Sequence, residues 1–383
     1  MSLVEQLFRP RRLRQRKYAT AVGAPKPRIG ALARVWRDFV RAVYRRPNMP
    51  VFAHDVVSAT RPSAVNTEII NICNADCSFC GYGKGEDGKA SDPRVKGKLK
   101  PDVFRHALKI YSAGGGGNFT LSPILGEASA HPGWLDMVRE ARSYPNITGV
   151  NCFTNAILLD RFGSKNILTS GLTHIAISTC IGGREAYKRL YGVDKYDVVV
   201  ANVFDLLRTN RELGEPVHID VCLRIDKPFE KFYASDIYKQ LTKVIDPRRI
   251  IILDDNWDDF RGVIGKEGLP EGQDFKEQYA DKSTPCYALF RQLMVLTDGT
   301  IQACTCRVEP ELWAGNVKDH ATLEEAWRDP KLELIRKDWF EGKLARCCQQ
   351  CSHYMPYTNL TEPARPQRVA REVLARAKRA IVN

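Results

Sequence analysis

The sequence lacks any apolar run that approaches the ~18 consecutive residues of a membrane-spanning helix, although 44% of its 383 residues are hydrophobic. Residues 1–8 are also too few and too interrupted to form the apolar core of a secretory signal peptide. We therefore expect a cytoplasmic protein that is soluble or peripheral at a membrane surface.

Histidine is scarce, with seven residues, whereas cysteine is abundant, with twelve. Without a secretory signal, so many cysteines indicate metal or redox chemistry in a reducing compartment rather than disulfides. Three of them, Cys73, Cys77 and Cys80, directly follow an apolar run. The closest histidines in sequence, His54 and His106, are distant from this triplet. The triplet alone cannot form a closed tetrahedral zinc site, because a fourth ligand is missing.

Three thiols on one loop suit a cubane 4Fe-4S cluster. Such a cluster takes a thiolate on each iron, so a loop with three leaves one iron open to a non-protein ligand. An open position distinguishes catalytic metal sites from closed structural ones. Two alternatives remain at this point: buried apolar cysteines with an accidental spacing, and a zinc site completed from elsewhere in the chain.

With Phe79 just before Cys80, the loop resembles the signature of the radical S-adenosylmethionine (radical SAM) superfamily. The resemblance implies that Cys73, Cys77 and Cys80 hold a 4Fe-4S cluster whose open iron binds SAM, with Phe79 beside the cofactor. Reductive cleavage of SAM then gives a 5′-deoxyadenosyl radical, which abstracts hydrogen from a substrate. An external electron donor of the flavodoxin or ferredoxin type is implied, and the substrate is left open.

Beyond residue 64 the chain alternates between β-rich runs and helical patterns. The β-rich runs cover 65–72, 118–124, 149–154, 174–179, 217–224 and 250–253. The helical patterns cover 101–112, 134–143, 196–213 and 230–245, with an irregular turn near 161–167. Strands separated by crossovers predict a parallel sheet with helices outside. The predicted α/β fold is a partial (β/α)6 TIM-like barrel, as in radical SAM enzymes, with its chemistry at the C-terminal ends of the strands.

Gly126 and Glu127 follow the second β-rich run. They partly resemble the Gly-Gly-Glu segment that binds the methionine ammonium of SAM in the family, although Leu125 and Ala128 depart from that pattern. A glycine would allow close approach of the backbone to a ligand, and a carboxylate could accept from an ammonium. A glycine and glutamate pair at a strand end is also common without any such role.

The next strand ends supply further candidates. Thr154-Asn155 resembles a recurrent Thr-Asn-Gly of the family, and Ser178 maps to a position that contacts SAM in relatives. Cys180 is a candidate for returning a hydrogen atom to a substrate radical, the alternative being a small buried residue. Arg224 ends the fifth run and is a candidate for binding a carboxylate or acting near the substrate, the alternative being a structural salt bridge.

A second set of cysteines lies near the C-terminus: Cys286, Cys304, Cys306, Cys347, Cys348 and Cys351. Between the first two, residues 293–303 carry an apolar run, an Asp298-Gly299 turn and a second short run, which predicts a β-hairpin. A Cys-x-x-Cys pair, Cys348 and Cys351, follows later. Four such thiolates close a metal site, and by spacing alone a zinc ribbon suits them equally well.

This segment resembles the twitch domain, a shortened relative of the SPASM domain that is appended to radical SAM barrels. Gly315-Asn316-Val317, Leu323 and Trp327 match the spacing of that family. The resemblance implies a single auxiliary 4Fe-4S cluster, with Cys306 and Cys347 as substitutes. The implied ligands are Cys286, Cys304, Cys348 and Cys351.

The net charge of +13 is concentrated at the two ends of the chain. Residues 9–28 form a basic arm, and 31–45 and 363–383 have the pattern of basic amphipathic helices. These helices either pack on the protein with a solvated basic side or rest on anionic lipid. Nucleic-acid binding is disfavoured, because no recognisable module or aromatic platform accompanies the charge.

The predicted organisation has four parts. They are a basic extension at 1–60, the barrel at 61–265, the auxiliary cluster domain at 266–360 and a basic helix at 361–383. The leading hypothesis is a radical SAM oxidation or rearrangement of a small molecule, sugar or lipid, with the auxiliary 4Fe-4S cluster assisting electron transfer. The alternatives are a peptide maturase that forms thioether or carbon-carbon crosslinks, and a non-enzymatic zinc protein associated with nucleic acid.

Overall fold

A computed structural model describes residues 19–20, 61–62, 64–82, 94–121, 124–276 and 282–355. The helices predicted at 31–45 and 363–383 lie outside these residues. The basic ends at 1–60 and 361–383 do so as well, apart from residues 19–20. In the described residues, no helix is both long and apolar enough to cross a membrane.

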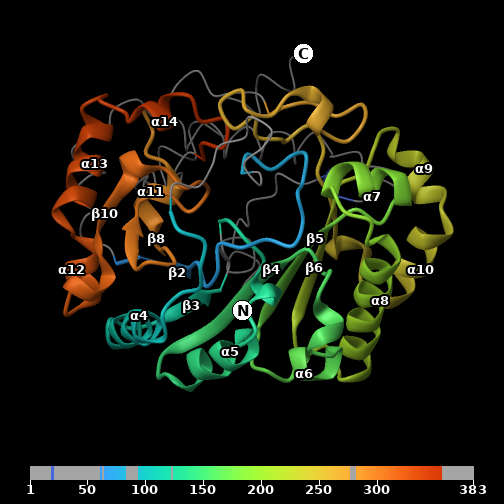
Figure 1. Cartoon of the computed structure of the whole chain (residues 1–383), viewed down its shortest axis with the longest axis horizontal. Coiled ribbons are helices and arrows are strands. Elements are labelled where there is room, and N and C mark those ends of the chain that lie inside the picture. The colour runs from blue at the N-terminus through green and yellow to red at the C-terminus, as the bar shows by residue number, and fades with distance from the viewer. Residues whose placement is uncertain are drawn as a thin grey trace, which may run out of the picture.

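One curved, open sheet of ten strands organises the described chain (Figure 1). Its order is β1-β7-β6-β5-β4-β3-β2-β8-β9-β10. Six of the strands form a parallel series in chain order, which confirms the predicted partial barrel. They are β2 (Ala64–Thr67), β3 (Gly117–Thr120), β4 (Ile147–Thr154), β5 (His174–Thr179), β6 (His218–Leu223) and β7 (Ile250–Ile252). The short β1 (Ala19–Thr20) pairs antiparallel with β7.

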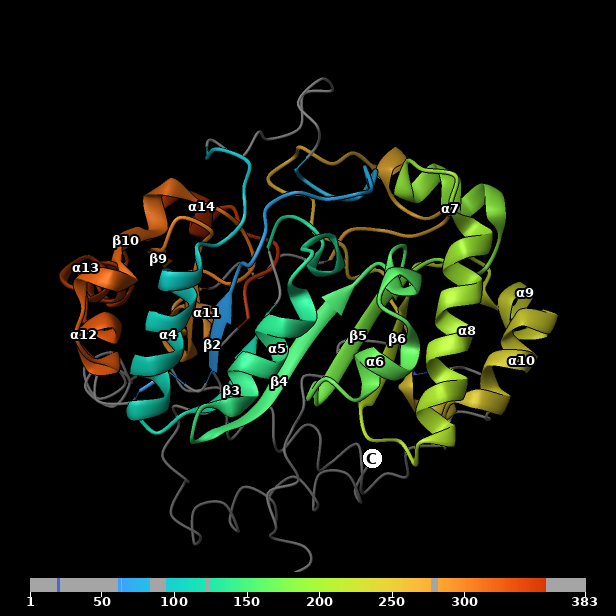
Figure 2. The same cartoon turned by 60° about the horizontal axis from the view of Figure 1, so that its bottom comes forward.

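Helices cover the outer side of these strands (Figures 1 and 2). They are α4 (Pro101–Ala113), α5 (Trp134–Ser143), α6 (Ser164–Leu168), α8 (Tyr196–Glu212), α9 (Phe229–Ala234) and α10 (Asp236–Val244). The helix α7 (Arg184–Tyr191) lies beyond the C-terminal ends of the strands (Figure 2). The pattern at 230–245 is two helices rather than one, because Ser235 caps α10 by accepting from the Tyr238 N–H. The helix α7 was not predicted.

The burial pattern along the strands shows which face of the sheet packs against the helices. In β6, Ile219, Val221 and Leu223 are fully buried and alternate with His218, Asp220 and Cys222, which are half-buried. Successive side chains of a strand point to opposite faces. The apolar face therefore joins the core beneath the helices, and the polar face lines the concave side of the barrel.

The C-terminal part continues the same sheet (Figure 1). Its strands are β8 (Gln292–Val295), β9 (Thr300–Gln302) and β10 (Trp313–Asn316), and its helices are α11 (Tyr287–Arg291), α12 (Leu323–Trp327), α13 (Pro330–Phe340) and α14 (Arg346–Gln349). The predicted hairpin is confirmed, with Gly299 at φ 89° in its turn. β8 runs parallel to β2 in the register Ala64↔Gln292, so this part extends the barrel sheet rather than forming a sheet of its own.

Candidate functional site

The cysteine loop follows β2 and passes over the C-terminal ends of the strands toward α7 (Figure 2, blue). The N–H groups of Asp76 and Ser78 donate to the carbonyl oxygens of Tyr191 and Leu190 at 3.0 and 2.9 Å. Gly192 ends α7 at φ 64°, and a Cβ there would lie 2.4 Å from the Asp76 carbonyl oxygen. The end of α7 thus holds the loop by direct backbone contact.

None of Cys73, Cys77 and Cys80 on this loop forms a disulfide. The Cys80 N–H donates to the Cys77 carbonyl oxygen at 3.1 Å, which bends the loop between these two residues. Cys73 is exposed, and the other two are half-buried. Three thiols on one bent loop, with an accessible side for a further ligand, fit a 4Fe-4S cluster.

Phe79 packs at the centre of an aromatic group beside the loop. Its ring lies 5.4 Å, centroid to centroid, from both Tyr191 and Trp257 in edge-to-face contacts. The guanidinium carbon of Arg224 lies 5.4 Å from the same ring centroid. Phe79 therefore ties the loop to α7 and to the end of β6, while its contact with a cofactor stays a prediction.

Gly126 approaches the chain just ahead of Cys73. It adopts φ +91°, and a Cβ there would lie 2.5 Å from the carbonyl oxygen of Ile70. The next N–H, that of Glu127, donates to the Ile72 carbonyl oxygen at 3.1 Å. Only glycine suits this conformation and this approach, so Gly126 seats the turn after β3 against the base of the cysteine loop.

The Glu127 carboxylate organises the ends of β3 and β4. Its Oε1 accepts from the Ser129 and Thr154 hydroxyls, each at 2.6 Å, and its Oε2 accepts from the Asn155 N–H at 2.8 Å. Burial raises the pKa of Glu127, while these hydrogen bonds act against that rise. The Asn155 amide in turn donates to the Asn74 side chain at 2.7 Å. Glu127 and Asn155 thus brace the cysteine loop, and direct contact with SAM stays a prediction.

Buried donors without a hydrogen-bond partner in the described part of the chain include the Nε of Arg224, the Nδ2 of Asn66 and the Nδ2 of Asn74. Arg224 uses Nη1 to donate to the Cys222 carbonyl oxygen at 2.9 Å. Ser178 is half-buried and lies beside Cys222 in the register of β5 and β6. A buried unsatisfied donor costs ~1–3 kcal/mol, so these donors fit a polar ligand bound here.

Cys180 lies in the hydrophobic core with no exposed surface. Burial raises the pKa of its thiol to about 11. A protonated thiol could donate hydrogen, but packing inside the core favours the alternative of a small buried residue. The catalytic role stays a prediction.

The second cysteine set surrounds one apolar cavity, so the structure brings together residues from 286 to 351. Its lining includes the four predicted ligands and Cys347, but not Cys306. The four predicted thiols around one space fit a closed 4Fe-4S site. The lining cysteines are Cys286, Cys304, Cys347, Cys348 and Cys351.

Cys304 has the electrostatic setting of a metal ligand. The Cys306 N–H donates to the Cys304 Sγ at 3.3 Å. Hydrogen bonds from the Cys306 thiol and backbone, together with the charge of Arg307, lower the pKa of Cys304 to about 7. The thiolate is the form that binds metals. Cys306 therefore acts on the site through Cys304.

Cys347 and Cys348 remain competing candidates. Their sulfurs lie 4.0 Å apart, and both line the cavity. Lys282 holds the segment beside them, because its ammonium donates to the carbonyl oxygens of Cys348, Gln349 and Cys351 at 2.9, 2.6 and 3.0 Å. These carbonyls lie at the end of α14, where a cation is favourable.

Sequence reasoning missed Arg307 and Lys282. Arg307 is buried, lines the cavity and has an Nη1 without a partner among the described residues. Its position directly after Cys306 was an available signal. Lys282 lies four positions before Cys286 in a charged segment, and no local pattern marks it.

Comparison with protein families identifies residues 286–352 as a SPASM domain, an iron-sulfur cluster-binding domain. The matched segment begins at Cys286 and includes Cys351. A comparison with curated protein sequences gives no match.

Solved structures resemble the chain in fold. Native anSMEcpe with bound AdoMet has a TM-score of 0.51 at 15% identity, over 83% of this chain and 98% of that one. BtrN in complex with AdoMet and 2-DOIA has a TM-score of 0.48 at 14% identity, over 78% of this chain and 98% of that one. Streptococcus suis SuiB bound to S-adenosylmethionine has a TM-score of 0.49 at 13% identity, over 72% of this chain and 68% of that one. At such identities the likeness to anSMEcpe establishes the architecture of the chain.

Proposed function

We propose that this chain, which has the fold of radical SAM enzymes and carries a SPASM domain, cleaves SAM reductively to abstract hydrogen from a substrate in its barrel. The observation that carries this proposal is the place of the cysteine loop. Cys73, Cys77 and Cys80 lie at the C-terminal ends of the parallel strands, where barrels of this kind gather their chemistry.

In this proposal Cys73, Cys77 and Cys80 hold the first cluster, and α7 keeps their loop in place. When bound, the cluster supplies the electron that cleaves SAM and so starts hydrogen abstraction. The remaining residues position ligands. Gly126 sets the turn beside Cys73, and the unpaired Nε of Arg224 is available to a carboxylate.

The second cluster is assigned to Cys286, Cys304, Cys351 and one of Cys347 and Cys348. A cluster held there would supply electron transfer, because four thiolates would leave no iron open to the substrate. The buried guanidinium of Arg307 places a positive charge beside this site.

We propose a polar small molecule or sugar as the substrate, oxidised or rearranged after hydrogen abstraction. The support is the C-terminal end of the barrel strands, where half-buried Ser178 and the unpaired Nε of Arg224 present polar groups. A lipid tail would leave such groups desolvated. A peptide substrate is the alternative. Transfer of deuterium from labelled candidate substrates to 5′-deoxyadenosine distinguishes a small molecule from a peptide.

The test is anaerobic reconstitution followed by incubation with SAM and dithionite. We expect about eight irons per chain, the content of two 4Fe-4S clusters. We also expect 5′-deoxyadenosine to form, as measured by mass spectrometry. Cys77→Ala should lose about four irons and all 5′-deoxyadenosine. Cys222→Ala, which removes a strand thiol outside both cysteine sets, is the matched control for iron and should retain about eight irons.

Wild-type protein with a full iron content and no 5′-deoxyadenosine would overturn the proposal. For the substrate, incubation with a deuterated candidate reports hydrogen abstraction directly, because the abstracted deuterium enters 5′-deoxyadenosine. Deuterium from a labelled sugar or cyclitol supports the small-molecule assignment, and deuterium only from a labelled peptide replaces it.

A further inference from the structure

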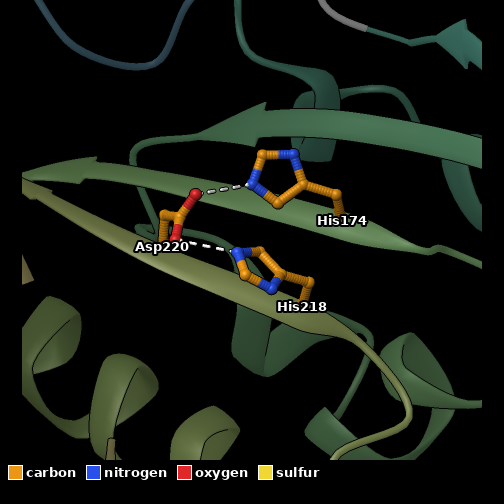
Figure 3. Close-up of side chains that lie close together, drawn as sticks. All are labelled: His174, His218 and Asp220. Atoms are coloured by element: carbon orange, nitrogen blue, oxygen red, sulfur yellow. Dashed lines mark hydrogen bonds and ion pairs between the residues drawn. The ribbon is translucent and has the colours of Figure 1, made fainter. Parts of the chain in front are cut away.

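Two histidines and an aspartate meet on the concave side of the sheet, away from both cysteine sites. Asp220 accepts from His174 Nε2 through Oδ2 and from His218 Nε2 through Oδ1, each at 3.0 Å. Figure 3 shows the three side chains converging over β5 and β6. Neither the cysteine motifs nor the proposed radical chemistry accounts for this group.

The backbone brings the three together by register and periodicity. His174 begins β5 and His218 begins β6, and the parallel register pairs these two positions directly. Asp220 lies two residues along β6, so its side chain is on the same face as that of His218. The group therefore lies on a rigid pair of strands, at the end opposite the cysteine loop.

We propose that His174, His218 and Asp220 form a binding site for one divalent transition-metal ion of the zinc type. Two imidazoles and one carboxylate are a common ligand set for such ions. Their ligand atoms all lie within 4.8 Å of one another. A tetrahedral zinc with bonds of ~2.0–2.1 Å separates its ligand atoms by ~3.3 Å. Small side-chain movements, with each imidazole proton moved from Nε2 to Nδ1, therefore convert the hydrogen-bonded group into a chelate.

The surroundings leave room for the ion and for a further ligand. The side chains of His174, Asp220 and His218 are 30%, 17% and 33% exposed. A hydrogen-bonded trio that is partly open to water adds little to stability, because solvent screens its charges. Three protein ligands leave a fourth tetrahedral position open, and the partial exposure of all three side chains leaves water access to it.

The first test measures zinc on the full chain after cluster reconstitution. After dialysis against zinc, the wild-type holoenzyme should hold one more zinc per chain than the His218→Gln and Asp220→Asn variants. The iron and sulfide contents of the three proteins should be equal. Loss of a direct ligand should weaken zinc binding by at least the ~10–100-fold found for outer-sphere changes. His106→Gln, on α4, is the matched control and should bind zinc as wild type does.

The second test identifies the ligands. Zinc X-ray absorption of the wild-type holoenzyme should show only nitrogen and oxygen neighbours at ~2.0–2.1 Å, whereas zinc captured by cysteines shows sulfur at ~2.3 Å. Sulfur neighbours, or equal zinc content in wild type and both variants, would overturn the proposal. Circular dichroism of both variants shows whether they fold. A loss of zinc binding shared by folded Asp220→Asn and His218→Gln then reflects the missing ligand and not unfolding.

Discussion

Asp258 and Arg307 form a buried ion pair that joins the segment leaving the barrel to the SPASM domain. The Arg307 Nε donates to Asp258 Oδ2 at 3.0 Å, and the side chains of Arg307 and Asp258 are only 3% and 11% exposed. The guanidinium carbon also lies 4.9 Å from the ring centroid of Phe260. Ser352, next to Cys351, donates to the same carboxylate. One carboxylate thus fixes both the cation beside the auxiliary cavity and the end of the Cys-x-x-Cys segment.

Asp258→Asn should destabilise the protein by about 3 kcal/mol, because it leaves the buried Arg307 charge uncompensated. Urea unfolding measures the change. Asp254→Asn is the matched control, since Asp254 pairs with Lys227 at the surface and is 41% exposed. The control should cost less than ~1 kcal/mol, and equal costs for the two variants would contradict the assignment.

The Asp258 variant should also change the dependence of stability on pH. Burial acts to raise the pKa of Asp258, but the Arg307 charge and hydrogen bonds from Ser352 and Arg307 outweigh it, so the pKa is lowered. Such a carboxylate stabilises the fold above its unfolded pKa of ~3.9, and this contribution is lost as pH falls through the lower folded value. The gap in urea midpoint between wild type and Asp258→Asn should therefore shrink below about pH 4.

Gly126→Ala should displace the turn beside Cys73 and weaken SAM binding. The new Cβ would lie 2.5 Å from the Ile70 carbonyl oxygen, at a φ of +91°. Gly163→Ala is the matched control, because Gly163 has φ +73° but nothing within 4 Å of the position that a Cβ would occupy. The control carries only the ~1–3 kcal/mol of a sparsely populated backbone conformation, since Gly163 combines φ 73° with ψ 135°. Calorimetric titration with SAM should show weaker binding for Gly126→Ala alone.

Cys304→Ala should remove the auxiliary cluster, and Cys306→Ala should retain it. Only Cys304 of the two lines the cavity. Iron per chain should fall from about eight to about four in Cys304→Ala and stay near eight in Cys306→Ala. The reverse result would show that the cluster uses Cys306. The same assay on Cys347→Ala and Cys348→Ala decides between these neighbours, because only the ligand variant loses iron.

Lys282→Met should make the auxiliary site release iron faster. The substitution removes a cation that donates to the carbonyl oxygens of Cys348, Gln349 and Cys351, and we expect roughly tenfold faster loss to a chelator. Lys343→Met is the control, since that ammonium pairs with Glu341 at the surface. Equal rates for wild type and Lys282→Met would remove the role assigned to Lys282.

Local patterns predicted much of the fold. The six parallel strands and the helices at Trp134–Ser143 and Tyr196–Glu212 agree with hydrophobic periodicity, since period and length are properties of short segments. The short helix α7 was missed, because Arg184–Tyr191 has too few residues for a clear apolar repeat. This short helix nevertheless holds the cysteine loop through the carbonyl oxygens of Leu190 and Tyr191.

The sequence by itself determined that Cys73, Cys77 and Cys80 share one loop, and this grouping predicts iron-sulfur chemistry because it needs no distant partner to be recognised. Only the tertiary structure showed that β8 extends the barrel sheet. Only it placed Arg307 against Asp258 and His174 beside His218. Such contacts join residues more than forty positions apart, so they depend on strand order and register, which no local pattern encodes.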